Sequence, residues 1–382
     1  MSQLLSIVAD RQILLAEETF SHFGMVELVD GRSIEQATVK NADVLLVRSV
    51  TRVDESLLKN SKVGFVGSAT SGIDHIDTDY LKKSNISFAH APGSNARSVA
   101  EYVLSSLFAT AEYNNFDLTK KTVGIIGCGQ VGSRVKRFLE SLGVTCLLND
   151  PPLAEQGSTE SYVGLERILE ADIITVHVPL TTDGKYPTSK LVDKSFLDGL
   201  KSDAILINTS RGEVVDESAL LSFKETNPES TLIFDVWCNE PEISISLLQQ
   251  TFIGTPHIAG YSYDGKLKAT KVLAQALQTE TNSMSAIAEV LTSETAVIDT
   301  LEYNDETAVQ LAVMQTYDVR SDAIALRELI SMPSGDGAIY FDSLRKNYPI
   351  RREFTNRQIN IKKLNNEMQQ RLLELGFKTG LA

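Results

Sequence analysis

Residues 122–150 read TVGIIGCGQVGSRVKRFLESLGVTCLLND, and this stretch decides the fold of the middle of the chain. It opens with a short apolar run, passes through the glycine pattern GCGQVG at 127–132 and ends on Asp150. A buried strand, a glycine turn, an amphipathic helix and a second strand, in that order, form the βαβ unit that binds dinucleotides. The stretch therefore predicts a Rossmann-type domain.

Each glycine of this pattern has its own task. Gly127 permits the tight turn, Gly129 lets the backbone approach a pyrophosphate, and Gly132 lets the helix pack closely on the strand. Asp150 follows about 20 residues later, where a carboxylate accepts hydrogen bonds from ribose hydroxyls and repels a 2′-phosphate. The alternative is a glycine turn and a capping aspartate that bind nothing, but both flanks match a dinucleotide site. We expect NAD as the cofactor rather than NADP.

Strand and helix patterns alternate on both sides of this unit. Apolar, β-branched runs predict strands at 4–9, 43–47, 64–67, 173–177, 204–208 and 232–236. Helical patterns lie at 34–40, 55–59 and 96–111. Such alternation is typical of parallel sheets covered by helices on both faces, so we expect an α/β fold with two doubly wound sheets.

The pattern changes beyond about residue 263. A long helix is expected at 266–288, and shorter helices at 322–330 and 365–375. Possible strands lie at 296–301 and 311–317. We expect a separate, smaller C-terminal module of about 90–100 residues with mixed α and β structure.

Composition excludes several classes of function. The chain has 382 residues and a formal net charge of −14, which disfavours nucleic acid as a partner. Its three cysteines are widely spaced and its five histidines show no ligand spacing, so we expect no metal site and a reducing compartment. The N-terminus reaches Asp10 too early for a signal peptide, and no apolar run could span a bilayer. A cytoplasmic protein without membrane partners is the expectation.

Polar side chains follow three of the apolar segments. Arg211 comes after the strand predicted at 204–208, Asp235 and Glu240 come at or after the next strand, and His257 lies in the loop TPHIAGY. Because the carboxyl ends of parallel strands meet at one edge of a sheet, these side chains can face a common crevice.

The chemistry of three of these residues is complementary for oxidising a 2-hydroxy acid. A histidine can take the hydroxyl proton, a glutamate can orient the imidazole, and an arginine can hold the substrate carboxylate or polarise the carbonyl. Taken singly, each residue has an ordinary reading as a loop histidine, a solvated turn residue or a surface ion-pair partner. Together, after a dinucleotide pattern, Arg211, Glu240 and His257 are predicted to form a catalytic trio.

The segments GCGQVG, NTSRGEVVDESAL, FDVWCNEP and PHIAG resemble those of the D-isomer-specific 2-hydroxyacid dehydrogenase family. The resemblance implies that Arg211, Glu240 and His257 are the catalytic residues. It implies substrate contacts at Ser49, Thr70 and Tyr261, the last in the segment HIAGY. The implied cofactor contacts are Gly127, Gly129, Gln130, Val131, Gly132, Asp150, Val178, Thr209, Ser210, Arg211, Asp235 and Gly260.

The resemblance also implies a domain plan. Residues 1–92 and 258–280 would form a flavodoxin-like substrate domain, 93–257 the NAD-binding Rossmann domain, and 281–382 a smaller α+β dimerisation domain. VRSVTRVDE, VGSATSGIDHID and the C-terminal extension resemble members that oxidise a phosphorylated acid, 4-phospho-D-erythronate, on the way to pyridoxal 5′-phosphate. The expected state is a homodimer. Another 2-hydroxy acid such as 3-phosphoglycerate, or a non-catalytic NAD-sensing role, are the alternatives.

Several other residues are weaker candidates for a function than the predicted catalytic trio. His177 lies in a predicted strand, where a structural role is favoured, and His75 lies in a turn that Asp77 could cap. Cys128 is read as a small buried filler, and Cys238-Asn239 stands where similar proteins more often carry Glu-Gly, which predicts packing changes only. Arg48 and Arg52 are candidate phosphate ligands or ordinary surface charges. The basic residues Arg345, Lys346, Arg351 and Arg352 form either a solvated cluster or a patch that a dimer brings to its partner's cleft.

Overall fold

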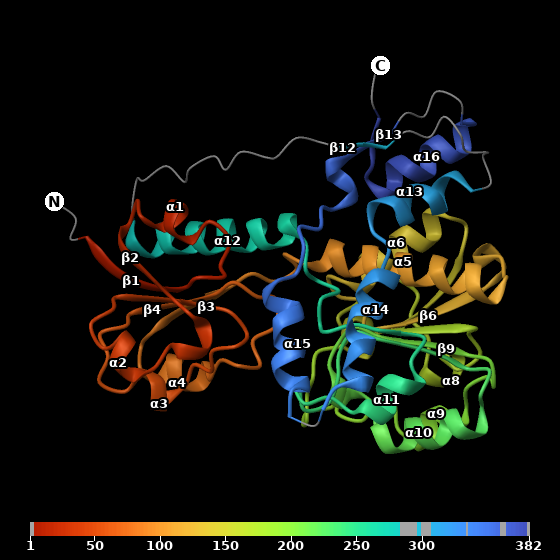
Figure 1. Cartoon of the computed structure of the whole chain (residues 1–382), viewed down its shortest axis with the longest axis horizontal. Helices are drawn as coiled ribbons and strands as arrows, with labels where there is room; N and C mark the ends of the chain where they lie inside the picture. Colours follow the sequence, from red (N-terminus) through yellow and green to blue (C-terminus); the bar gives the residue numbers. More distant parts are fainter. Residues whose placement is uncertain (1–3, 283–295, 299–306, 334, 360–363, 380–382) are drawn as a thin grey trace. The chain divides into compact units, whose positions relative to one another are not determined.

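A computed structural model of the chain describes residues 4–282, 296–298, 307–333, 335–359 and 364–379. The chain folds into two compact units (Figure 1). Unit 1 contains Met1–Asn95 and Ser262–Ser293, and unit 2 contains Ala96–Tyr261 and Glu294–Ala382. The described C-terminal residues therefore belong to the same unit as the glycine pattern. The three-domain plan stays a prediction.

Unit 1 is built on a five-stranded parallel sheet with strand order β2-β1-β3-β4-β5. This is the flavodoxin-like order, as expected. Helices α1 and α12 cover one face and α2, α3 and α4 cover the other (Figure 1). The strands are β1 (Leu5–Asp10), β2 (Gly24–Val29), β3 (Val44–Val47), β4 (Phe65–Ser68) and β5 (Ser87–His90). The helices are α1 (Ala16–Phe20), α2 (Gln36–Val39), α3 (Glu55–Leu58), α4 (Thr78–Lys83) and α12 (Tyr263–Thr281).

Unit 2 contains a six-stranded parallel sheet with strand order β11-β10-β9-β8-β6-β7. The chain steps from β6 outward to β7 and then returns across β6 to β8, which makes a topological switch point between β6 and β8. The glycine pattern follows β6 at this point. The strands are β6 (Thr122–Ile126), β7 (Thr145–Asn149), β8 (Ile173–Val176), β9 (Ile205–Asn208), β10 (Thr231–Phe234) and β11 (Ile253–Gly254).

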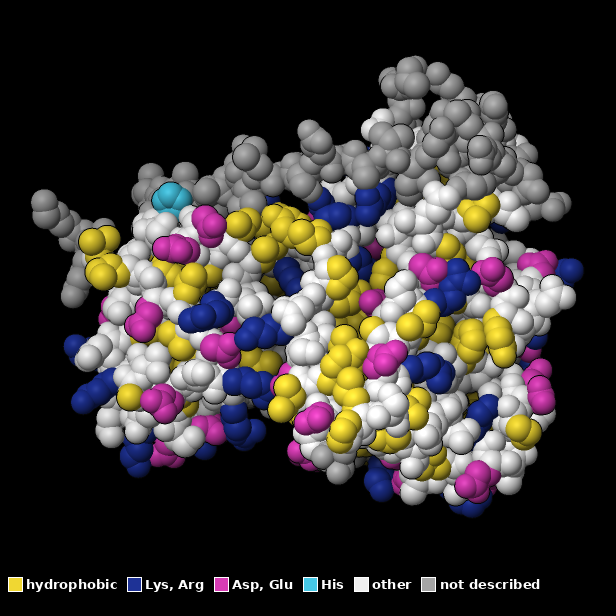
Figure 2. Space-filling model, in the orientation of Figure 1, with side chains coloured by type: hydrophobic (Ala, Val, Ile, Leu, Met, Phe, Trp, Pro, Cys, Tyr) yellow, Lys and Arg dark blue, Asp and Glu magenta, His cyan; other side chains and the backbone are white. Residues whose placement is uncertain are grey.

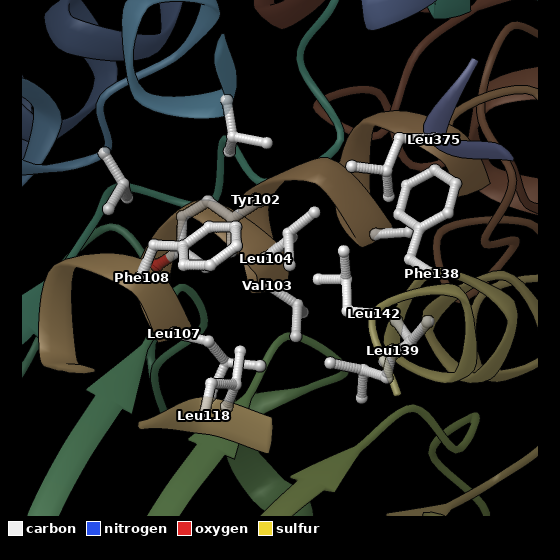
Figure 3. Close-up of a cluster of buried hydrophobic side chains, with 14 of the residues drawn as sticks. Tyr102, Val103, Leu104, Leu107, Phe108, Leu118, Phe138, Leu139, Leu142 and Leu375 are labelled. Atoms are coloured by element: carbon white, nitrogen blue, oxygen red, sulfur yellow. The ribbon is translucent and has the colours of Figure 1, made fainter. Parts of the chain in front are cut away.

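Helices cover both faces of this sheet, and the doubly wound fold expected from the sequence is confirmed. On one face, α5 (Ala96–Asn114) packs against α6 (Gly132–Ser141). Figure 3 shows Tyr102, Leu104 and Leu107 of α5 near Phe138 and Leu139 of α6. Burying each such side chain stabilises the fold by about 1.5–3 kcal/mol. The other helices of this part are α7 (Pro151–Glu155), α8 (Leu165–Ile168), α9 (Lys194–Asp198), α10 (Glu217–Thr226) and α11 (Ile245–Gln250).

The described C-terminal residues of unit 2 add the α-helices α13 to α16 and a small parallel sheet in the order β12-β13-β14. The mixed α+β character is as expected. Its helices are α13 (Ala308–Thr316), α14 (Arg320–Arg327), α15 (Gly337–Lys346) and α16 (Asn366–Leu375). Its strands are β12 (Ala296–Ile298), β13 (Arg357–Ile359) and β14 (Lys378–Thr379).

One predicted element of this part is wrong. Residues 311–317 were expected to form a strand, but they lie mostly in α13. The helix buries Ala308, Val309, Ala312 and Val313, which is the spacing of one helical face, and most of its other residues are good helix formers. The strand predicted at 296–301 begins as expected with β12, and 299–301 lie outside the described residues. The helix predicted at 266–288 is α12, which ends at Thr281, and 283–288 also lie outside them.

The surface carries charges of both signs. Lysine and arginine side chains alternate with acidic ones over the face shown in Figure 2. None of the helices in the described ranges is long and apolar enough to cross a membrane. The same residues hold no group of three or more His, Cys, Asp or Glu side chains arranged to bind a metal ion.

Candidate active site

The three glycines after β6 have three different surroundings. Gly127 has a φ of +87°, in the left-handed region, and a Cβ added there would lie 2.8 Å from the backbone of His177. A Cβ on Gly132 would lie 2.0 Å from the carbonyl oxygen of Gly127, so the start of α6 packs directly on the turn. A Cβ on Gly129 would meet nothing within 4 Å. The turn, the close packing and the open backbone required by a pyrophosphate are all present.

Asp150 lies beside this turn. One carboxylate oxygen accepts a hydrogen bond from the amide of Cys128 at 2.8 Å, and the other caps α7 by accepting from the amide of Leu153 at 3.1 Å. Val178 borders the same turn, because a Cβ on Gly127 would lie 2.9 Å from its side chain. An acidic side chain at the end of β7, next to open backbone at Gly129, fits the ribose and pyrophosphate of NAD.

Replacing Asp150 with alanine is expected to weaken NAD binding about tenfold or more, because a hydrogen bond donated to a carboxylate contributes about 1.5–3 kcal/mol. NADP should gain relative to NAD, since the charge that repels a 2′-phosphate is lost. Titration with both cofactors measures the ratio. Asp193→Ala is the matched control. Asp193 caps α9 by accepting a hydrogen bond from the amide of Phe196 at 2.9 Å, so this variant loses a similar helix cap but leaves the glycine turn after β6 unchanged. An unchanged NAD/NADP ratio in Asp150→Ala would contradict the assignment.

The loop after β9 is held by its own side chains. The Asn208 side-chain oxygen accepts hydrogen bonds from the amide of Ser210 at 3.0 Å and from its hydroxyl at 2.7 Å. The Asn208 amide group donates to the carbonyl of Arg211 at 2.8 Å. Arg211 in turn donates to the carbonyl of Ser210 at 2.7 Å. This loop therefore presents Arg211 in a defined position at the carboxyl end of the sheet.

His177 forms a hydrogen bond with Thr209 of this loop. Its Nδ1 lies 3.0 Å from the hydroxyl of Thr209, and its Nε2 lies 2.9 Å from the hydroxyl of Thr175. Burial lowers the pKa of His177 to about 3, so the ring is neutral at pH 7. A neutral ring with both nitrogens hydrogen-bonded is suited to positioning Thr209 and not to proton transfer.

His257 and Glu240 form a close pair. The Nδ1 of His257 lies 2.7 Å from Glu240 Oε2, and Glu240 Oε1 accepts a hydrogen bond from the amide of Trp237 at 3.0 Å. Because an ionised carboxylate only accepts, Nδ1 carries a proton and Nε2 is the nitrogen available to a substrate. Burial acts to raise the pKa of Glu240, but His257, its hydrogen bond and the charge of Arg345 outweigh it and hold the pKa below its ordinary value.

The buried carboxylate of Asp235 holds the loop that carries His257. It accepts hydrogen bonds from the hydroxyl of Thr255 at 2.6 Å and from the amides of Ile258 at 2.7 Å and Ala259 at 2.9 Å. The backbone of His257 has a φ of 56°, a left-handed conformation that is unfavourable for a residue other than glycine. Burial raises the pKa of Asp235 despite these hydrogen bonds and the nearby His257. The hydrogen bonds keep the strained loop in place.

Contacts between loops bring the Arg211 and Glu240 segments together. A Cβ on Gly212 would lie 2.0 Å from the backbone of Trp237, so the two loops touch through their backbones. Asn239 has a φ of 60°, which explains why glycine suits this position and why asparagine is tolerated. The catalytic trio predicted from the sequence therefore lies within one unit, at the carboxyl ends of β9, β10 and β11.

The predicted substrate contacts are divided between the units. Ser49 and Thr70 lie in unit 1, after the neighbouring strands β3 and β4, and Tyr261 lies in unit 2 beside Gly260. The hydroxyl of Thr70 donates to the carbonyl of Gly72 at 2.8 Å and is 2.6 Å from the hydroxyl of Ser68. Ser49 is exposed.

Two candidate phosphate ligands of unit 1 form ion pairs with carboxylates. Arg48 lies 2.9 Å from the buried Asp10, and Arg52 lies 2.9 Å from Asp54. The turn at His75 is as expected, with Asp77 capping α4 by accepting from the amide of Tyr80.

The interpretation of the basic C-terminal residues as a solvated cluster is wrong for Arg351 and Arg352, whereas Lys346 is exposed as expected. Arg351 and Arg352 are only 6% and 8% exposed. The guanidinium carbon of Arg351 lies 3.6 Å from the centre of the Tyr317 ring, and one of its nitrogens donates to the carbonyl of Ala259 at 3.1 Å. The alternative, in which a dimer brings this stretch to its partner's cleft, stays a prediction. Arg345 is half-buried beside Tyr261.

Some supporting residues gave no signal in the sequence. The hydroxyl of Tyr102 donates to Thr255, which donates to Asp235, and the indole of Trp237 donates to the carbonyl of Thr255 at 2.9 Å. Thr255 stands only two residues before His257, so its nearness to the loop was the one available hint. Tyr102 and Arg345 lie far from the trio along the chain.

The chain resembles known proteins over nearly its whole length. Residues 93–259 match the NAD-binding domain of the D-isomer-specific 2-hydroxyacid dehydrogenases, and 292–376 match a domain of unknown function (DUF3410). A relative from Marinobacter nauticus named erythronate-4-phosphate dehydrogenase is 42% identical over 381 residues, covering 97% of this chain and 99% of its own length. One of the same name from Cronobacter sakazakii is 43% identical over 355 residues, covering 92% and 93%.

Solved structures share the fold at lower identity. A 3-phosphoglycerate dehydrogenase from Entamoeba histolytica with bound NAD⁺ superposes with a TM-score of 0.64 at 24% identity, covering 76% of this chain and 99% of its own. A D-lactate dehydrogenase from Aquifex aeolicus, complexed with NAD and lactic acid, gives 0.60 at 24% identity, covering 72% and 96%. Both likenesses concern the fold.

Proposed function

Since the chain belongs to the D-isomer-specific 2-hydroxyacid dehydrogenase family, we propose that it oxidises 4-phospho-D-erythronate to 2-oxo-3-hydroxy-4-phosphobutanoate with NAD, a step toward pyridoxal 5′-phosphate. The observation that carries the proposal is the pair of His257 and Glu240, whose Nδ1 and Oε2 atoms are 2.7 Å apart. The Glu240 loop touches the loop of Arg211, and the chain also has the glycine turn of a dinucleotide site. The names of relatives that match nearly the whole chain support this choice of substrate.

The residues of the chain divide the chemistry among them. Arg211 binds the substrate carboxylate and polarises the carbonyl as it forms. His257 Nε2 takes the proton of the C2 hydroxyl, and Glu240 stabilises the imidazolium that results. When bound, NAD supplies the acceptor for the hydride that leaves C2. The proton, the hydride and the new C=O bond are thereby all accounted for.

The cofactor would be held by residues around the switch point between β6 and β8. The turn at Gly127–Gly132 meets the pyrophosphate through backbone amides, and Asp150 meets the ribose. Both carboxylate oxygens of Asp235 accept hydrogen bonds from amides of the loop that carries His257, so we propose that it shapes the nicotinamide site through that loop. The remaining proposed contacts are Gln130, Val131, Val178, Thr209, Ser210, Arg211 and Gly260.

The assay that tests this function is NADH formation with 4-phospho-D-erythronate, with and without an added 2-oxo acid that can reoxidise the cofactor. We expect kcat/KM for 4-phospho-D-erythronate to exceed kcat/KM for 3-phosphoglycerate by at least about tenfold. The reason is that the second acid is one carbon shorter, so its carboxylate and phosphate cannot both match the same site. Both substrates are compared at the same salt concentration. A preference for 3-phosphoglycerate would overturn the substrate. Tight NAD binding with no turnover of any 2-hydroxy acid would favour the NAD-sensing role.

We also propose that the protein works in the cytoplasm as a homodimer assembled through residues 281–382. Ile324 of this segment is exposed and lines a groove with Tyr113 and Phe252 of the same unit, which supports an association surface that extends beyond the segment. Substrate binding would involve Ser49 and Thr70 as well as Tyr261.

A further inference from the structure

Arg345, near the end of α15, reaches the loop that carries His257. Its guanidinium carbon lies 5.8 Å from the centre of the Tyr261 ring and 6.0 Å from that of Phe341, within the range of cation–π attraction. It also forms a hydrogen bond with Tyr261, and its charge acts on Glu240. A residue of the C-terminal segment thus lies beside the catalytic pair.

Two features of its surroundings leave Arg345 able to bind an anion. Its Nε is buried and has no hydrogen-bond partner. No carboxylate of the described part of unit 2 lies within salt-bridge distance of it, whereas Arg48 in unit 1 is paired with Asp10. Removing a cation from water is costly unless an anion or other hydrogen-bonding groups replace the water. A half-buried guanidinium held by aromatic rings is therefore a ready site for an anion.

The proposed substrate has two anionic ends, a carboxylate beside the reacting carbon and a phosphate at C4. Arg211 is committed to the first. We propose that Arg345, together with the hydroxyl of Tyr261, binds the C4 phosphate and so selects a phosphorylated acid. The fork of guanidinium donors matches phosphate oxygens, which a single ammonium group cannot do. This inference rests on the proposed function, and it gives the segment matched by the domain of unknown function a direct part in the active site.

The test compares a phosphorylated substrate with its unphosphorylated form. We expect Arg345→Gln to lower kcat/KM for 4-phospho-D-erythronate by about 10–100-fold, since a hydrogen bond to a charged group contributes about 1.5–3 kcal/mol. For D-erythronate, kcat/KM should stay within about threefold of wild type. Lys346→Gln is the matched control, because Lys346 is the exposed neighbour on α15. For Arg345→Lys, which keeps the charge but loses the fork of donors, kcat/KM for 4-phospho-D-erythronate should lie between the values of Arg345→Gln and wild type.

An equal loss for both acids would overturn the proposal, because it would mean that Arg345 acts only through Tyr261 or Glu240. No loss for either would overturn it too. If wild type oxidises neither acid, the proposed function fails, and the site is judged by binding: with NAD present, inorganic phosphate should raise the Tm of wild type and of Lys346→Gln but not of Arg345→Gln. Equal shifts would refute the phosphate site. If Arg345→Gln does not fold, Arg345→Lys decides both measurements.

Discussion

Replacing His257 with alanine is expected to lower kcat by at least about a hundredfold, while the affinity for NAD stays within about threefold of wild type. The reason is local: His257 Nδ1 is held by Glu240 at 2.7 Å, so only Nε2 is left for the substrate proton. The dinucleotide turn after β6 makes no use of this ring. Steady-state turnover and a separate cofactor titration measure the two quantities independently.

His22→Ala is the matched control, because His22 is an exposed histidine of unit 1. It should leave both quantities unchanged. Turnover of His257→Ala near the wild-type rate would remove His257 from the catalytic role. A parallel loss of NAD affinity would instead mean that the loop had collapsed and that the ring has a structural role.

The second large effect concerns stability. Asp235→Ala should reduce the free energy of unfolding by about 3–5 kcal/mol, because it leaves buried donors without an acceptor. The donors are the hydroxyl of Thr255 and the amides of Ile258 and Ala259, all within 2.9 Å of the carboxylate. Urea unfolding followed by circular dichroism gives the value. Any folded fraction should also be inactive, since His257 stands in this loop.

Asp203→Ala serves as the comparison, since Asp203 is an exposed aspartate of the same unit just before β9. Its effect should stay within about 0.5 kcal/mol. A change of the same small size in Asp235→Ala would show that the loop keeps its conformation by other contacts.

Local patterns predicted most of the fold. The central strands are continuous buried runs, so β3, β8 and β9 fall within a residue of their predicted bounds. The edge strand β2 was not predicted, because Glu27 interrupts its apolar pattern. Residues 311–317 favour a strand by their sequence because they open with four apolar residues, and in so short a run a buried helix and a buried strand look alike.

The site was predictable where it depends on strand ends and not where it depends on distant packing. Arg211, Glu240 and His257 each follow a strand closely, and parallel strands end at the same edge. Arg345 belongs to a helix far along the chain, and a basic residue in an acidic protein looks solvated until its packing is known. Arg351 was misread for the same reason: the stacking on Tyr317 that buries its charge leaves no periodic trace in the sequence.

The contacts of Arg351 limit how this family can be recombined. Its guanidinium holds the carbonyl of Ala259 two residues beyond His257, and the amide of Phe354 donates to the buried Glu101 of α5 at 3.0 Å. A chimaera that exchanged the C-terminal segment between distant relatives would therefore mismatch the catalytic loop as well as the surface. The C-terminal segment and the dehydrogenase core are therefore expected to evolve together, and we do not expect the segment to be exchanged as an independent module.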